Sequence, residues 1–385
     1  MIRRFILALT ALALTFPALA IVPSPPQVSA TAYLLIDAES GAILAEQNAD
    51  QPVPPASLTK MMTSYILAGE ISEGRVAETD MVVVSENAWS QNPVFKGSSL
   101  MWIEPGKDVS VADLQRGIIV SSGNDATVAV AEHVAGSEAV FVDMMNANAE
   151  ELGMVDTYYT NSHGLPDPNH VTTARDLATL AKAMIVDYPE HYAIYKEREF
   201  TYNGIRQYNR NTLMAEDATV DGLKTGHTEE AGYCLVASAE RRDMRLISVV
   251  MGTSSKSARK SATRALLNYG FRFFDTDEVF AAMTELDTPR VWKGAEDTVP
   301  VGLEDATVLT LPRGKHKNVK TELDIEHELI APLEAGDKVG TVTLTLDGET
   351  VFHAPVVALV PVEEGGLFKR LWDMILMWIA GLFRA

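Results

Sequence analysis

The sequence is very poor in cysteine, since Cys234 is the sole one among 385 residues. One thiol cannot form an intrachain disulfide, so the chain is not a disulfide-stapled domain and its stability must come from hydrophobic cores. Glycine-rich phosphate loops are missing too. His316, His327 and His353 lie near acidic residues, but no pair has the spacing of a helical metalloprotease. We therefore expect no metal and no cofactor.

Positive charge is also in short supply. The 32 Lys and Arg residues stand against 52 Asp and Glu residues, which gives a formal net charge of −20 at pH 7. A surface this acidic repels nucleic acid, so we expect no nucleic-acid partner. The acidity by itself does not identify a substrate.

The first twenty residues have the pattern of an export signal. They combine basic Arg3 and Arg4, an apolar run from Phe5 to Phe16, and the small-x-small ending Ala18-Leu19-Ala20. This pattern predicts a cleavable signal peptide at residues 1–20, because the apolar run is too short for a spanning anchor. The mature, exported chain is expected to start near residue 21.

The remaining chain is longer than one hydrophobic core usually organises, so two domains are expected. In residues 27–275, strand-like runs at both ends enclose helical patterns, and a further helix over about 256–269 should end at Gly270. The Thr173 to Asp176 segment has a capping-box pattern before another helix. We predict one antiparallel sheet covered by helices, an α/β (α+β) domain in which the beginning and end of the segment meet.

Residues 276–362 have a different character. Short alternating runs, such as 339–346 and 351–360, are separated by the turn Asp347-Gly348, and no long helical pattern appears. This arrangement predicts a small β-sandwich domain, with residues 363–366 as the linker that follows it.

The C-terminal segment, residues 366–385, reads as an amphipathic helix. Its apolar residues recur three and four apart and include Trp372 and Trp378, whereas Lys369, Arg370 and Asp373 share the other side. The apolar stretch is marginal for spanning, so we expect a helix that anchors the chain to a membrane surface. A helix packed on the protein's own surface is the alternative.

A possible nucleophile lies at the start of a predicted helix. Ser57 and Lys60 are three residues apart, so they share one helix face a single turn apart. A serine hydroxyl needs an adjacent base, and a lysine can serve if burial or nearby positive charge lowers its pKa. Alone, however, this four-residue motif is common by chance.

Two further motifs follow in the chain. Ser122-Gly123-Asn124 lies in an apolar stretch, and Lys224-Thr225-Gly226 lies at the start of the strand-rich section. A small-residue strand flanked by lysine and threonine can pair with an extended peptide and offer donors to a terminal carboxylate.

These three motifs together resemble the set S-x-x-K, S-x-N and K-T-G of the penicillin-binding and β-lactamase superfamily. Within that superfamily, the chain is most similar to the serine D-Ala-D-Ala carboxypeptidases of low molecular mass, the peptidase S11 family. The resemblance is strong over residues 27–275 and looser through the β-rich domain and the tail. It rests on the segments 92–101, 122–126, 161–165, 221–227 and 270–274.

The resemblance implies a catalytic set. Ser57 would be the acylated nucleophile, Lys60 the base that takes its proton, and Ser122 the relay that delivers a proton to the leaving D-alanine. Asn124 would hold the lysine and the substrate amide.

The resemblance also implies a substrate-binding set. Lys224, Thr225 and the neighbouring Gly226 would bind around the terminal carboxylate, and the backbone N–H groups of Ser57 and His227 would form the oxyanion hole. Arg259 falls where the family has an arginine near that carboxylate, although an exposed helical arginine is an equal alternative. His163 would shape a loop at the edge of the site.

The implied substrate is a peptidoglycan stem peptide ending in D-Ala-D-Ala, with β-lactams as covalent inhibitors, and the implied location is the periplasmic face of the inner membrane. Three alternatives stay open: a D,D-endopeptidase, a β-lactamase and a non-catalytic wall-binding protein. The loop 161–170 contains Asp167 but lacks the glutamate to which fast deacylation is assigned in class A β-lactamases.

Overall fold

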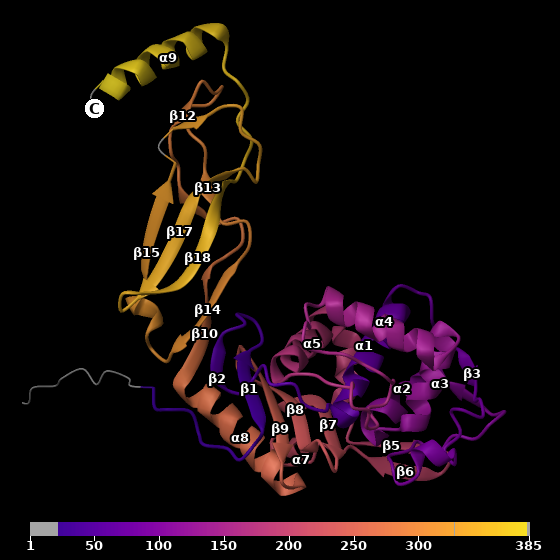
Figure 1. The fold of residues 1–385 in the computed structure, drawn as a ribbon. Helices are drawn as coiled ribbons and strands as arrows, with labels where there is room; N and C mark the ends of the chain where they lie inside the picture. Colours follow the sequence, from indigo (N-terminus) through magenta and orange to yellow (C-terminus); the bar gives the residue numbers. More distant parts are fainter. Residues whose placement is uncertain (1–21, 327, 383–385) are drawn as a thin grey trace, which may run out of the picture.

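The computed structural model describes residues 22–326 and 328–382, with side chains up to Ile379 in the last helix. The predicted signal peptide, residues 1–20, lies outside the described residues. A broad α/β part, a narrower β-rich part and a final helix follow one another in space (Figure 1). The final helix lies at the end of the β-rich part that is remote from the α/β part.

A five-stranded antiparallel sheet forms the centre of the α/β part, in the order β2-β1-β9-β8-β7. Tyr33 pairs with Gln47 on one side and with Val250 on the other, so the beginning and the end of this part meet in one sheet, as predicted. The strands are β1 (Ala32–Asp37), β2 (Ile43–Gln47), β7 (Val220–Thr228), β8 (Gly232–Arg241) and β9 (Met244–Thr253).

Helices cover both faces of the sheet. Successive residues of β1 point to opposite sides, so Leu34 packs into one core with α1 and α5, whereas Leu35 packs into a second core under α8. Thr173 caps α5, as the sequence predicts, by accepting the backbone N–H of Asp176 at 3.1 Å. The helices are α1 (Lys60–Ser72), α2 (Val111–Arg116), α3 (Asn124–Ala135), α4 (Glu138–Glu151), α5 (Ala174–Asp187), α6 (Pro189–Tyr192), α7 (Leu213–Glu216) and α8 (Lys256–Phe273).

The predicted end of α8 at Gly270 is wrong, because the helix continues to Phe273. Gly270 is a packing residue here: a Cβ at this position would lie 2.5 Å from Leu246 of the sheet. The glycine lets the helix lie close to the strands and does not terminate it. A tight hairpin turns at Asn203-Gly204, where φ is positive at both residues, as such turns require.

Shorter elements complete the α/β part. Two hairpins are β3 (Met81–Val83) with β4 (Asp108–Ser110) and β5 (Glu199–Tyr202) with β6 (Ile205–Tyr208). The short 3₁₀ helices are η1 (Ala56–Thr59), η2 (Pro93–Phe95) and η4 (Ala193–Lys196), and η3 (Gly117–Ser121) is a wider π-helical turn.

The β-rich part has a core of its own, which includes Val291, Leu309, Val342 and Val356. Strand β10 pairs with β14, and a second sheet has the order β11-β13-β18-β17-β15. The elements are β10 (Phe274–Phe280), β11 (Glu285–Asp287), β12 (Val291–Trp292), β13 (Val301–Gly302), β14 (Thr307–Pro312), η5 (His316–Asn318), β15 (Lys320–Ile325), β16 (Leu329–Ile330), β17 (Lys338–Leu346) and β18 (Glu349–Ala358).

A polar chain joins the two parts. The buried carboxylate of Asp37 accepts the Thr276 hydroxyl at 2.8 Å, and Thr310 lies within hydrogen-bond distance of both Thr276 and Ser40. Each hydroxyl therefore has a partner from the other part. These hydrogen bonds fix how β10 and β14 meet the β1–β2 hairpin.

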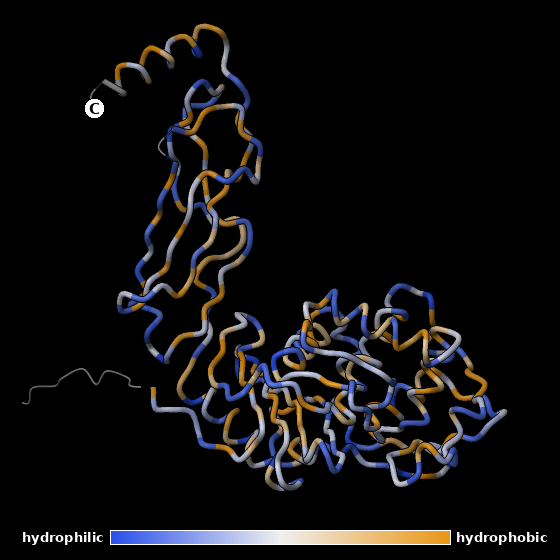
Figure 2. The backbone as a smooth tube through the Cα atoms, viewed as in Figure 1, coloured by the Kyte–Doolittle hydropathy of each residue, from blue (hydrophilic) through white to orange (hydrophobic). Residues whose placement is uncertain are grey.

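The last helix, α9 (Leu367–Leu382), presents its apolar side to the surroundings. Phe368 is 92% exposed and Trp378 is 69% exposed, and hydrophobic residues recur along the helix in Figure 2. Asp373 is fully buried instead, where it accepts the backbone N–H of Lys293 at 2.8 Å. Across the described residues, none of the helices combines the length and the apolar character needed to cross a membrane.

Candidate active site

Ser57 and Lys60 lie where η1 runs into α1. The side chain of Ser57 is half-buried, whereas Lys60 at the start of α1 is fully buried. The Lys60 Nζ atom is 3.3 Å from Ser57 Oγ. The three-residue spacing thus brings the amine to the hydroxyl, as the sequence predicts.

The surroundings of Lys60 suit a base. Burial is the main cause that lowers the pKa of Lys60 from 10.5 to about 7; the charge of Arg210 lowers it further and that of Asp125 opposes the shift. Two acceptors hold the Nζ atom, namely Asn124 Oδ1 at 2.6 Å and the His163 carbonyl at 2.5 Å. A lysine with this pKa is about half neutral at pH 7.

Ser122 stands at the end of the π-helical turn η3 in a left-handed conformation with φ +60°. Non-glycine residues rarely adopt this conformation, and it is held where the surrounding structure demands it. Lys224 Nζ donates to Ser122 Oγ at 2.7 Å. Burial lowers the pKa of Lys224 well below its usual value, and the charge of Lys60 adds to the shift. The second and third motifs therefore meet at one hydroxyl.

The strand β7 forms one wall of the site at the edge of the sheet. Its Lys224 and Thr225 are buried, whereas His227 is exposed and stacks on Tyr233 with the ring centroids 3.9 Å apart. Gly226 lets the strand approach η1, because a Cβ there would lie 3.0 Å from the Pro55 carbonyl. The small residue therefore keeps the edge of β7 next to Ser57.

Arg259 is buried and not an exposed helical arginine. Its side chain reaches from α8 to the strands, where Nη1 donates to the Gly226 carbonyl at 3.2 Å. The guanidinium also lies over the ring of Tyr233, 5.8 Å from its centroid. Arg259 therefore belongs to the same wall as the K-T-G strand.

A cleft of about 500 Å³ opens at the site; its lining includes Ser57, Ser122, Asn124, Thr225 and Gly226, whereas Lys60 and Lys224 lie buried behind it. Arg210, Lys256 and Arg259 supply positive side chains to its walls, and no Asp or Glu is among the described residues that line it. The positive charge of this cleft contrasts with the net charge of −20 of the whole chain. Clefts lined by one sign of charge attract ligands of the opposite sign, so this one suits a carboxylate.

Two residues of the site have no role that the sequence predicts, Arg210 and Asp125. Arg210 follows the β5–β6 hairpin, where its Nε donates to the Ser121 carbonyl at 3.1 Å, and no motif marks it. Asp125 directly follows the S-x-N motif and receives the backbone N–H groups of Met101 and Trp102, both at 2.8 Å. The charges of Arg210 and Asp125 act on Lys60 in opposite directions.

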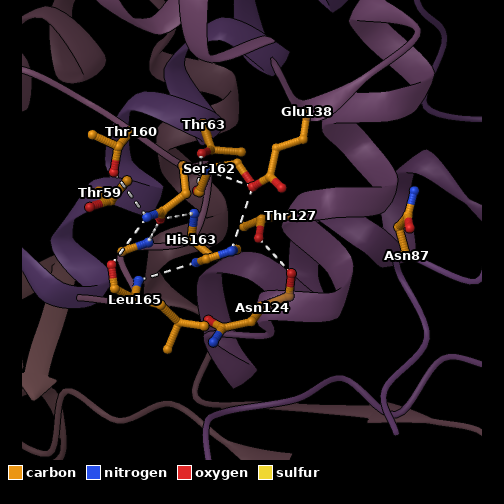
Figure 3. A network of polar contacts seen from close by, with 12 residues as sticks. Thr59, Thr63, Asn87, Asn124, Thr127, Glu138, Thr160, Ser162, His163 and Leu165 are labelled. Atoms are coloured by element: carbon orange, nitrogen blue, oxygen red, sulfur yellow. Dashed lines mark hydrogen bonds and ion pairs between the residues drawn. The ribbon is translucent and has the colours of Figure 1, made fainter. Parts of the chain in front are cut away.

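The loop at 161–165 closes the back of the site, and Figure 3 shows its polar contacts. The His163 side chain lies in this loop beside Phe95, with the ring centroids 5.8 Å apart. Burial is the main cause that lowers the pKa of His163 to about 3, so the imidazole is neutral. The backbone carbonyl of His163, and not its ring, is the group that contacts Lys60.

Comparison with known proteins agrees with this geometry. The D-alanyl-D-alanine carboxypeptidase family model, Peptidase S11, matches residues 20–255, and the model of the C-terminal domain of penicillin-binding protein 5 matches residues 274–364. The chain is 47% identical to the D-alanyl-D-alanine carboxypeptidase DacC of Escherichia coli over 91% of this chain and 89% of that protein. It is 44% identical to DacA of Haemophilus influenzae over 94% and 92%.

Solved structures give the same answer. Penicillin-binding protein 5 from Haemophilus influenzae matches with a TM-score of 0.86 and 44% identity, covering 89% of this chain and all of that one. Penicillin-binding protein D2 from Listeria monocytogenes, in its ampicillin-bound form, matches with a TM-score of 0.57 and 30% identity over 65% of this chain and all of that one. The chain therefore belongs to the Peptidase S11 family of D-alanyl-D-alanine carboxypeptidases, and its second domain is of the type found at the C-terminus of penicillin-binding protein 5.

Proposed function

We propose that this protein is a serine-type D-Ala-D-Ala carboxypeptidase, which removes the terminal D-alanine from peptidoglycan stem pentapeptides through an acyl-enzyme on Ser57. The observation that carries this proposal is the buried Lys60, whose Nζ is 3.3 Å from the Ser57 hydroxyl and whose pKa is lowered to about 7. Few structural roles require a fully buried lysine beside a serine that opens into a cleft.

In the acylation step, Lys60 takes the proton of the Ser57 hydroxyl while Oγ attacks the carbonyl carbon of the penultimate D-alanine. The backbone N–H groups of Ser57 and His227 stabilise the oxyanion of the tetrahedral intermediate. When the intermediate collapses, the peptide C–N bond breaks and the leaving amine of D-alanine takes a proton relayed by Ser122. The relay starts from Lys60 and involves Ser122, which Lys224 holds by a 2.7 Å hydrogen bond.

In the deacylation step, water attacks the acyl-enzyme and restores the Ser57 hydroxyl, with Lys60 again as the base. Asn124 holds Lys60 through the 2.6 Å hydrogen bond during both steps and also binds the substrate amide. β-Lactams acylate the same Ser57 and act as covalent inhibitors. Their acyl-enzymes persist if the attacking water is poorly activated.

The terminal carboxylate of the substrate binds at the K-T-G strand. Lys224 and Thr225 face it from β7, Gly226 keeps this strand next to η1, and Arg259 contributes its charge from α8. The support for this orientation is the cationic lining of the cleft in an otherwise acidic protein. Good binding thus requires a free carboxylate next to the scissile bond. A peptide bond in the interior of a chain lacks one.

Each alternative function would require something different of the site. A class A β-lactamase uses a carboxylate next to the attacking water, but the described residues lining the cleft include neither Asp167 nor any other acid. A D,D-endopeptidase would accept a leaving group longer than D-alanine. A non-catalytic wall-binding protein has no need for the lowered pKa of Lys60.

The deciding experiment is the release of free D-alanine from a peptide ending in D-Ala-D-Ala by the purified mature protein, with one arm preincubated with penicillin. Release that penicillin blocks would establish the carboxypeptidase. Stable penicillin labelling without release would favour the endopeptidase or the wall-binding role, and rapid penicillin turnover would favour the β-lactamase.

We further propose that the protein is exported and held at the periplasmic face of the inner membrane by α9. In this proposal residues 1–20 are the cleaved signal, 27–275 the catalytic domain, 276–362 the β-sandwich domain and 366–385 the anchor. The support is that the apolar side of α9, including Phe368 and Trp378, is exposed while Asp373 on its polar side is buried against the β-rich part. An apolar helix face with tryptophans is typical of binding at a membrane interface.

A further inference from the structure

Glu138 contacts the back of the site and does not line the cleft. It begins α4, where the Ser137 side chain caps the helix by accepting the backbone N–H of Val140. One oxygen of Glu138 accepts both the backbone N–H and the hydroxyl of Ser162, at 3.0 and 2.7 Å. Figure 3 shows this carboxylate pointing at Ser162 and His163 from α4. Glu138 thus ties the 161–165 loop to a rigid helix.

Ser162 is held from its carbonyl side as well. Thr63, one turn after Lys60 in α1, donates its hydroxyl to the Ser162 carbonyl at 2.7 Å. With Glu138 on the N–H and Thr63 on the carbonyl, Ser162 has little freedom to rotate. The next carbonyl, that of His163, is therefore fixed in direction, and it is the group 2.5 Å from Lys60 Nζ.

The loop needs an external attachment of this kind. Its shape is local, because Asn161 Oδ1 accepts the backbone N–H of both His163 and Gly164. Its position is not local: Gly164 lies so close to η1 that a Cβ there would be 1.9 Å from the Ala56 carbonyl. The hydrogen bonds of Ser162 to Glu138 hold this turn against η1, the segment that carries the nucleophile.

The contact between Glu138 and His163 is not an ion pair. The backbone N–H of Leu165 donates to His163 Nδ1 at 3.1 Å, which assigns the proton of the neutral ring to Nε2. That nitrogen lies 3.6 Å from Glu138 Oε1. Glu138 therefore acts on the loop mainly as a hydrogen-bond acceptor for Ser162.

The direction of the His163 carbonyl matters for a neutral lysine. A neutral amine has two N–H groups and one lone pair. Asn124 Oδ1 and the His163 carbonyl take the two N–H groups, so the lone pair is left to face Ser57 Oγ. If the carbonyl moved away, the amine could turn an N–H toward Ser57, and the same neutral lysine would no longer be aimed as a base.

We infer that Glu138 is a positioning residue for acyl transfer, which acts through Ser162 and the His163 carbonyl to aim the lone pair of Lys60 at Ser57. This inference rests on the proposed role of Lys60 as the base. The role needs an acceptor oxygen at Glu138, and the negative charge is secondary to it. The amide of glutamine can supply that oxygen, but alanine cannot.

The test is the rate of penicillin acylation of the full mature protein at about pH 9, where Lys60 is neutral and its pKa no longer limits the rate. Rates are divided by the number of sites labelled at completion, so that an unfolded fraction does not count. We expect Glu138→Ala to lower this plateau rate by about tenfold, as misplacement of a reacting group does. We expect Glu138→Gln to stay within about twofold of the parent protein, as should the control Glu150→Ala at the other, exposed end of α4.

Several outcomes would overturn the inference. A plateau rate of Glu138→Ala equal to that of the parent would do so, even with fewer labelled sites, because it would leave Glu138 a stability role alone. An equal loss in Glu138→Gln and Glu138→Ala would assign the effect to charge. If Glu138→Ala does not fold, Ser162→Ala removes one of the two hydrogen bonds, and an unchanged plateau rate in that variant would refute the inference. Absence of labelling in the parent protein would instead refute the proposed function itself.

Discussion

Acylation of Ser57 should become faster as the pH rises through about 7. The neutral form of Lys60 is the base, and burial is the main cause that lowers the pKa of this lysine from 10.5 to about 7. The charge of Arg210 acts in the same direction, whereas Asp125 acts against it. The acylation rate therefore rises with pH, because protonation of Lys60 below pH 7 removes the base and deprotonation above pH 7 supplies it.

The size of the effect follows from the pKa. With a pKa of about 7, about half of the Lys60 amines are neutral at pH 7, against roughly one in 3,000 for a lysine with the usual value of 10.5. Below the pKa the neutral fraction falls about tenfold for each pH unit. We thus expect the acylation rate at pH 5 to be on the order of one hundredth of the plateau rate.

The assay is stopped-flow acylation with a fluorescent penicillin between about pH 5 and pH 9.5. Lys60→Ala should abolish the rising limb together with most of the rate, whereas Lys107→Ala, at an exposed lysine near β4, should leave both unchanged. A rate that is flat across this range, or one that still rises steeply above pH 9, would refute the argument. Either result would mean that burial does not lower the pKa of Lys60 as described.

Three further changes test other parts of the structure. Ser57→Ala should abolish covalent penicillin labelling with an unchanged circular dichroism spectrum, and labelling of that variant would exclude Ser57 as the nucleophile. Deletion of residues 366–385 should release the mature protein from membranes with D-alanine release intact; a truncated protein that still sediments with membranes would contradict the anchor. Gly164→Ala should destabilise the fold by about 2 kcal/mol or more and slow acylation, because its Cβ would lie 1.9 Å from the Ala56 carbonyl and its φ is +84°. Gly153→Ala, with a similar φ but open space around it, separates strain from clash, and equal melting temperatures for the two variants would refute the packing argument.

Local features of this protein could be predicted because neighbours in the chain decide them. Ser57 and Lys60 meet since three residues make about one helical turn, and Thr173 caps α5 because its side chain reaches the N–H three residues on. The hairpin at Asn203-Gly204 follows from the positive φ that these residues tolerate. Gly270 shows the limit of such rules, since its partner Leu246 comes from a distant strand.

The sequence alone therefore determined the three motifs, the types of the elements that carry them and, by resemblance, the family. The tertiary structure decided which groups meet across long separations: Asn124 on Lys60, Lys224 on Ser122, and Glu138 behind the loop of His163. It also decided that Arg259 is buried and that the polar side of α9 faces the protein. The physical reason is that burial and long-range hydrogen bonds arise from the packing of whole elements, and the pKa of a lysine depends on that packing and not on its neighbours in the chain.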